Sequence, residues 1–151
     1  MTRTMAFWDA SALVPLCVNE ATSRSSHAYL GKFAPVVWWG SLVEVHSAIF
    51  RLHRGKEITD AGMKGALARL RRLSEEWKEI LPGDAIRELA VRLLSEHSLR
   101  AADSLQPAAS LTWCRQRPSR RNFICADHKL AQAVHLAGFS VVLLSGSAVQ
   151  A

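Results

Sequence analysis

The stretch NFICADHKLAQAVHLAGFSVVLL, residues 122–144, decides the fold that we predict for this chain. Its first five residues form an apolar run typical of a buried strand, and residues 127–137 follow with the apolar spacing of a helix. Gly138 is the residue type that most often ends a helix, and SVVLL at residues 140–144 is a second apolar strand. Two apolar strands joined by one helix form a βαβ unit, which implies a parallel sheet covered by helices on both faces.

The rest of the chain alternates in the same way between short apolar runs and helical patterns. We predict strands at residues 4–8 and 36–39. Hydroxyl and carboxylate side chains mark the expected helix N-caps, at Ser41, Thr59 and Asp84. The expected helices span residues 10–18, where Pro15 would end or kink the helix, a second stretch to about residue 33, 41–54, 59–80 and 84–97, and a further helix starts near residue 103.

Length and composition indicate one globular domain with a basic surface. The chain has 151 residues, of which 49% are hydrophobic and 21% charged, and 19 basic against 13 acidic residues give a net charge of +6. This sign favours a nucleic acid as partner over a neutral metabolite, although solubility alone is an alternative explanation. Many of the basic residues fall in three windows without acids: Arg51, Arg54 and Lys56; Lys64, Arg69, Arg71 and Arg72; and Arg115, Arg117, Arg120 and Arg121.

Cysteine usage and targeting signals point to the cytoplasm. The three cysteines are widely spaced and form no CxxC pattern, so we expect neither a disulfide framework nor a zinc knuckle. The apolar run from Met5 contains Asp9 and Pro15, is too short to cross a bilayer and lacks a convincing cleavage site. We therefore expect a cytoplasmic protein that has no membrane partner.

Two aspartates directly follow apolar strands. Asp9 comes after TMAFW and Asp127 after NFICA, and in a parallel sheet the working groups lie at the carboxyl ends of the strands. Each aspartate could equally be a helix N-cap, and Ser11 could be only a turn or cap hydroxyl. If the two strands are neighbours, the two carboxylates lie close together.

Two further acids stand among apolar residues. Glu44 lies on the flank of the apolar face of its predicted helix, one turn from the start, where the helix dipole alone would favour a glutamate. Asp103 lies in LRAADSLQPAASL, where a helix cap is the simple alternative and would place Pro107 early in the helix. Four crowded carboxylates repel one another and need protons or a cation. Oxygen ligands alone suit Mg²⁺ or Mn²⁺, and such an ion beside basic patches is suited to phosphodiester hydrolysis.

Four segments of the sequence resemble the motifs of the PIN domain, and specifically of the VapC-like toxin ribonucleases of bacterial type II toxin–antitoxin systems. The strand that ends in Asp-x-Ser, the helix that begins Ser-x-x-Glu, an Arg-x-x-Asp segment before a small-residue helix, and a strand that ends in Asp occur in the family's order over nearly the whole chain. The matching segments are FWDASALV, SLVEVHSAI, LRAADSLQPAA and NFICADHKLAQAVHLAGFSVV.

The resemblance implies a three-layer α/β/α sandwich on a mainly parallel sheet, as a single PIN-like domain over residues 1–151. It also implies a metal-dependent endoribonuclease that hydrolyses RNA with a water activated by Mg²⁺ or Mn²⁺. The implied ligands of one or two ions are Asp9, Glu44, Asp103 and Asp127, and Ser11 would orient Asp9 or a water. A cognate antitoxin protein and a homodimer are the implied partners.

The sequence departs from the family at Ser104, at Gln106-Pro107 and at His128, where Ala, His-Leu and a second acid are commoner. These departures bear on the local helix start and on the number of ions. Exposed tryptophans could stack a base of the RNA, with Trp38, Trp39 and Trp113 as candidates, although tryptophans at such positions more often belong to a core.

Three alternatives remain at this point. One is a non-catalytic RNA-binding or regulatory module on the same fold, which would bind metal weakly or not at all. The second is a phosphoryl-accepting, receiver-like domain, against which Asp9 has no acidic neighbour and no lysine ends the last strand. The third is a metal-dependent DNA nuclease.

Overall fold

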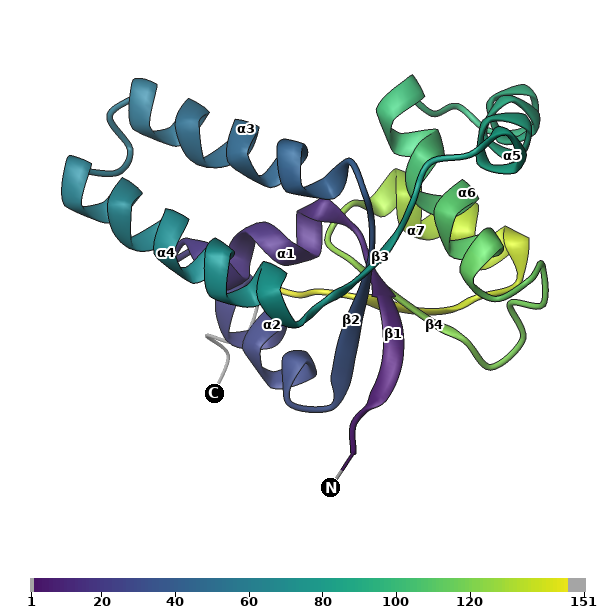
Figure 1. Cartoon of the computed structure of the whole chain (residues 1–151), viewed down its shortest axis with the longest axis horizontal. Coiled ribbons are helices and arrows are strands. Elements are labelled where there is room, and N and C mark those ends of the chain that lie inside the picture. The colour runs from purple at the N-terminus through teal and green to yellow at the C-terminus, as the bar shows by residue number, and fades with distance from the viewer. Residues whose placement is uncertain (1, 147–151) are drawn as a thin grey trace.

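Five parallel strands form the centre of the computed structural model, which describes residues 2–146 (Figure 1). The strands lie in the order β3-β2-β1-β4-β5, and each neighbouring pair is parallel. Residue 1 and residues 147–151, which are the ends of the domain predicted over residues 1–151, lie outside the described residues. The strands are β1 (Thr4–Trp8), β2 (Phe33–Trp38), β3 (Lys78–Ile80), β4 (Asn122–Cys125) and β5 (Ser140–Leu143).

Helices cover both faces of this sheet, as the apolar strands predict. The first four helices pack on one face and the last three on the other, and Figure 1 shows these two groups on opposite sides of the strands. The helices are α1 (Ala10–Cys17), α2 (Ser23–Leu30), α3 (Ser41–Arg54), α4 (Asp60–Glu76), α5 (Asp84–Glu96), α6 (Ala101–Trp113) and α7 (His128–Ala137).

Strand β1 shows how the two cores are built, because successive side chains of a strand point to opposite faces. Ala6 and Trp8 pack with α1, α3 and α4, whereas Phe7 packs with α5, α6 and α7 and stacks on Phe123 of β4 with ring centroids 5.2 Å apart. All four side chains are fully buried. The expected three-layer α/β/α sandwich on a parallel sheet is therefore confirmed.

The strand order reverses direction between β1 and β4. The chain first builds outward from β1 to β2 and β3, and then crosses to the other side of β1 for β4 and β5. In open parallel sheets this switch point leaves a crevice at the carboxyl ends of the two central strands, and ligands bind there. Here the two strands that flank the switch point are those that end at Asp9 and Asp127.

The structure corrects the predicted helix at residues 59–80. Thr59 is the N-cap, as predicted, and its hydroxyl accepts a hydrogen bond from Gly62 N (3.0 Å). The helix ends at Glu76, however, and Lys78–Ile80 forms the edge strand β3. A three-residue strand at the edge of a sheet needs no apolar run, which is why the periodicity did not reveal it.

Other helix starts also differ from the prediction. Ser41 and Asp84 are the first residues of their helices and do not cap them, because Gly40 and Gly83 stand at the N-cap positions. Helix α1 runs through Pro15 to Cys17 instead of ending there. Within residues 2–146, none of the helices has the length and hydropathy needed to cross a membrane.

Candidate acidic active site

The four predicted acids gather at the carboxyl edge of the sheet. Asp9 and Asp127 stand directly after β1 and shortly after β4, where they are the N-caps of α1 and α7. Glu44 lies in the first turn of α3, the helix that follows β2, and Asp103 lies in the first turn of α6. In Figure 1, α1, α3 and α7 all start from this end of the sheet.

Electrostatic coupling links the four carboxylates pair by pair. Burial is the main cause that raises the pKa of Asp9 to about 7, and the neighbouring charges of Glu44 and Asp127 raise it further. Burial also raises the pKa of Glu44, to which Asp103 adds its charge, and the pKa of Asp103, to which Asp127 adds. The acids are therefore near enough for the charges of neighbours to raise the pKa of Asp9, Glu44 and Asp103.

Asp9 is the most deeply buried of the four, with 5% of its surface exposed. Its Oδ2 accepts a hydrogen bond from Ser11 N (3.1 Å) and its Oδ1 accepts one from Ser11 Oγ (2.8 Å). The same hydroxyl oxygen accepts a hydrogen bond from Ala126 N (2.8 Å), just after β4. Ser11 therefore orients Asp9, as the resemblance implies, and also ties the end of β1 to the end of β4.

Asp127 is fixed by the start of α7. Its Oδ1 accepts hydrogen bonds from Lys129 N (2.9 Å) and Leu130 N (3.1 Å), two of the amides that a helix start leaves without partners. The capping explanation is therefore correct for Asp127 and for Asp9. It does not compete with a role in the site, because the caps fix both carboxylates at the edge where the other two acids lie.

Glu44 is held by a residue that the sequence prediction did not single out. Gln106 of α6 donates a hydrogen bond from Nε2 to Glu44 Oε1 (2.9 Å), and this bond lowers the pKa of Glu44 against the effect of burial. The signal for Gln106 in the sequence was its departure from the family pattern three residues after Asp103, which is one turn of the same helix.

Asp103 opens into a pocket of about 660 Å³ beside Asp127. Helix α6 begins at Ala101 with Arg100 as N-cap, so Asp103 is in the first turn and is not the cap that the simple alternative required. The positive charges of Arg100 and Lys129 line the same pocket and lower the pKa of Asp103 against the burial that raises it. Neither cation was predicted from the sequence, although each stands within three residues of a predicted acid.

The donor chemistry at this edge fits Mg²⁺ or Mn²⁺. All four candidate ligands are carboxylates, their mutual repulsion favours a cation, and neither histidine nor thiolate takes part. Within the described residues, no three His, Cys, Asp or Glu side chains yet stand close enough to form a metal-ligand group. A cation bound here would therefore require the carboxylates to turn toward one another, and the metal site stays a prediction.

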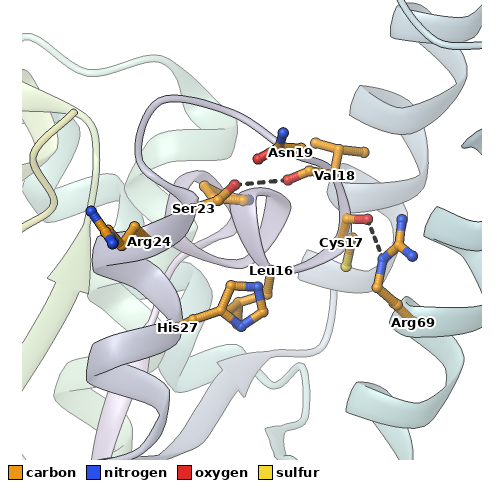
Figure 2. Close-up of a pocket in the computed structure, with 9 residues that line it drawn as sticks. Leu16, Cys17, Val18, Asn19, Ser23, Arg24, His27 and Arg69 are labelled. Atoms are coloured by element: carbon orange, nitrogen blue, oxygen red, sulfur yellow. Dashed lines mark hydrogen bonds between the residues drawn. The ribbon is translucent and has the colours of Figure 1, made fainter. Parts of the chain in front are cut away.

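The second and third basic windows lie in different parts of the fold. The third lies in the connection from α6 to β4, at the amino edge of the sheet and therefore opposite the acids. Arg69 of the second donates from Nε to Cys17 O (2.7 Å) at a pocket of about 490 Å³ around the end of α1, which Figure 2 shows and which none of the four acids lines. Arg69 thus ties α4 to α1, and Arg71 forms an exposed ion pair with Glu75 (3.6 Å).

The three tryptophans proposed for base stacking also differ in exposure and location. Trp38 is a core residue with 7% of its surface exposed, whereas Trp39 is 51% exposed just before the helix that carries Glu44. Trp113 ends α6 and packs under the guanidinium of Arg121, 5.3 Å from its ring centroid. Only Trp39 of the three is therefore an exposed aromatic at the acidic edge.

Comparison with known proteins supports the fold. No protein-family model matches the sequence, and no curated protein matches it significantly. Solved structures do match: PAE2754 from Pyrobaculum aerophilum at TM-score 0.64 and 16% identity, over 92% of this chain and 90% of that one. FitAcB from Neisseria gonorrhoeae matches at TM-score 0.64 and 12% identity, over 95% and 99% of the chains. A toxin–antitoxin complex from Klebsiella pneumoniae matches at TM-score 0.57 and 18% identity, over 82% and 88%. At these identities the likeness concerns the fold.

Proposed function

We propose that this chain is a metal-dependent endoribonuclease, and that it is the toxin of a toxin–antitoxin pair. The observation that carries the proposal is the four carboxylates at the carboxyl edge of the sheet, where burial and the charges of neighbouring acids raise the pKa of Asp9, Glu44 and Asp103. Perturbed carboxylates gathered at such a crevice are typical of a functional site.

Asp9, Glu44, Asp103 and Asp127 would hold one or two Mg²⁺ or Mn²⁺ ions. When bound, such an ion lowers the pKa of a coordinated water and offsets charge on the phosphoryl group. The carboxylates would also accept the proton of the attacking water. Ser11, which donates two hydrogen bonds to Asp9, would keep that carboxylate in one orientation.

Arg100 and Lys129 are the basic residues best placed to hold the RNA backbone. They line the same pocket as Asp103 and Asp127, whereas the third basic window lies at the opposite edge. Cations beside the acids lessen the repulsion between the carboxylates and an approaching phosphate. They contribute affinity without reading sequence, so the choice of RNA depends on other contacts.

A cognate antitoxin is the proposed protein partner. The likeness to a chain of the Klebsiella pneumoniae toxin–antitoxin complex supports this assignment. Expression of the chain alone should then arrest growth, while the Asp9→Asn variant should not. A homodimer is the second proposed assembly, and light scattering of the purified protein tests it.

Cleavage of structured RNA by the purified protein tests the enzymatic proposal directly. We expect cleavage with Mg²⁺ or Mn²⁺, none in EDTA, and none for Asp9→Asn or Asp103→Asn. The matched control is Asp84→Asn, an exposed aspartate at the start of α5 that should leave cleavage unchanged. Cleavage that persists in EDTA would refute the metal mechanism, and a DNA substrate in the same assay tests the DNA-nuclease alternative.

One observation favours the alternative of a non-catalytic RNA-binding module. Among residues 2–146 the acids do not already form a ligand group of three, so a chain that only binds RNA would have the same geometry. Titration with Mn²⁺, followed by electron paramagnetic resonance, separates the two functions. Saturable binding that Asp9→Asn abolishes supports the nuclease, and RNA binding without any Mn²⁺ binding supports the module.

A further inference from the structure

Gln106 is a polar side chain enclosed in the protein interior. It lies in α6 with only 1% of its surface exposed, among the helix residues that pack against the sheet. A buried amide is tolerated only where its hydrogen-bonding groups find partners. The partners of Gln106 are therefore informative, and both of them belong to the start of α3.

The amide of Gln106 bridges α6 to α3 through contacts with two residues. Its Nε2 lies 2.9 Å from Glu44 Oε1 and 3.1 Å from Ser41 Oγ, and the Ser41 hydroxyl lies 3.4 Å from Gln106 Oε1. An ionised carboxylate only accepts hydrogen bonds, so the NH₂ group must be the one that faces Glu44. Ser41 is fully buried and does not cap its own helix, which leaves its hydroxyl free to anchor this amide.

Glu44 needs such a partner in order to stay at the acidic edge. Its side chain has three rotatable bonds, and the negatively charged carboxylate of Asp103 on the neighbouring helix repels its own. Without a donor beside it, the glutamate would lower its energy by turning away toward water. Gln106 supplies that donor from the same helix that carries Asp103.

We propose that Gln106 is a positioning residue, whose Nε2–Glu44 contact holds the Glu44 carboxylate at the acidic edge where it can serve as a cation ligand. The part of this inference that concerns cation binding rests on the proposed function. The part that concerns the position of the Glu44 carboxylate does not. Residues that hold a ligand through a hydrogen bond change metal affinity or activity by about ten- to a hundredfold when replaced. Helix α6 thus contributes to the site twice, through the Asp103 carboxylate and through Gln106.

Three variants test the proposal. Gln106→Met keeps the length and burial of the side chain but cannot donate, whereas Gln106→His retains a ring N–H donor. The matched control is Ser110→Ala, which removes another buried polar group of α6, one whose hydroxyl bonds only to Pro107 O (2.7 Å) within the helix. Should Gln106→Met not fold, Ser41→Ala, which removes the anchor of the amide, takes its place.

Mn²⁺ affinity and metal-free crystal structures are the two measurements. We expect Gln106→Met to weaken Mn²⁺ binding about ten- to a hundredfold, with Gln106→His closer to the wild type and Ser110→Ala unchanged. In the metal-free structure of Gln106→Met, the Glu44 side chain should have turned from the acidic edge or occupy several conformers. RNA binding in EDTA should be the same for all variants.

The experiments distinguish failure of the Gln106 proposal from failure of the proposed metal-dependent function. If Glu44 keeps its position in metal-free Gln106→Met and Mn²⁺ affinity does not change, Gln106 is only a packing residue and the proposal is overturned. If the wild-type protein binds no Mn²⁺ at all, the metal-dependent function fails together with the ligand role of Glu44. In that case the crystal structures still decide whether Gln106 holds the carboxylate.

Discussion

Replacement of Asp9 by asparagine should make the metal-free protein more stable at pH 8. The carboxyl group has a pKa of about 7 in the folded protein against an ordinary value of 3.8, mainly because it is buried. The unfolded chain therefore ionises Asp9 more readily than the folded protein does, and ionisation favours unfolding. The resulting loss in the free energy of unfolding is absent below pH 3.8, grows as the pH rises, and is complete above pH 7.

The size of the effect follows from the difference between the two pKa values. The shift of roughly three pKa units, at 1.36 kcal/mol each, corresponds to about 4 kcal/mol. Asparagine has nearly the shape of a protonated aspartate and does not ionise, so Asp9→Asn avoids this loss. Asparagine keeps only one of the two oxygens that accept hydrogen bonds from Ser11. The loss of the other hydrogen bond reduces the gain in stability by about 1 kcal/mol. We expect Asp9→Asn to exceed the wild type by about 3 kcal/mol at pH 8.

Urea unfolding at several pH values, followed by tryptophan fluorescence in EDTA, measures this difference. The free energies of unfolding of the two proteins should lie close together near pH 4 and diverge as the pH rises to 8. Mg²⁺ should then stabilise the wild type alone, by about 2.7 kcal/mol at a concentration a hundred times the dissociation constant. If Asp9→Asn is the less stable protein at pH 8 in EDTA, then Asp9 is not a strained, ionisable group and this reasoning fails.

Three further predictions follow from single contacts. Ser11→Ala should lower the free energy of unfolding by about 1–3 kcal/mol, because it leaves Ala126 N without its partner, and urea titration measures the loss. Gly138→Ala should lower the melting temperature in calorimetry, since the residue has a φ of 110° and a Cβ there would lie 3.0 Å from a proline Cγ; an unchanged melting temperature would contradict this. Arg100→Ala should weaken RNA binding in EDTA and reduce its salt dependence by about one phosphate contact. Arg120→Ala, at the opposite edge of the sheet, should change that salt dependence less, and equal effects would argue against RNA at the acidic edge.

The sheet and two of the four acids were the most predictable parts of the molecule. Strands β1 and β4 are short apolar runs, each followed within two residues by an aspartate, and apolar runs of this kind are buried on both faces of a parallel sheet. Once the strands are parallel, their carboxyl ends share one edge, and only the adjacency of β1 and β4 had to be learned from the structure. Asp9 and Asp127 were placed by the same rule that placed the strands.

The contacts that hold Glu44 were not predictable from local pattern. Ser41 looked like a helix cap because hydroxyl residues are favoured there, but its hydroxyl bonds to Gln106, which is 65 residues away in the sequence. Sequence periodicity describes which side of a helix is buried. It does not say which buried polar groups of two different helices meet, since that depends on how the helices cross.

The capping explanation of the strand-end aspartates is compatible with the proposed catalytic one, because a single arrangement can serve both. A helix start supplies amides that fix one oxygen of a carboxylate, as Lys129 N and Leu130 N fix Oδ1 of Asp127. A parallel sheet brings such helix starts to the same edge, so caps on neighbouring strands become neighbouring carboxylates. Burial then turns neighbours into a strained group, as the pKa of Asp9 indicates. A cation that relieves this strain would at the same time stabilise the fold, and for this reason metal binding should be visible in stability before it is visible in catalysis.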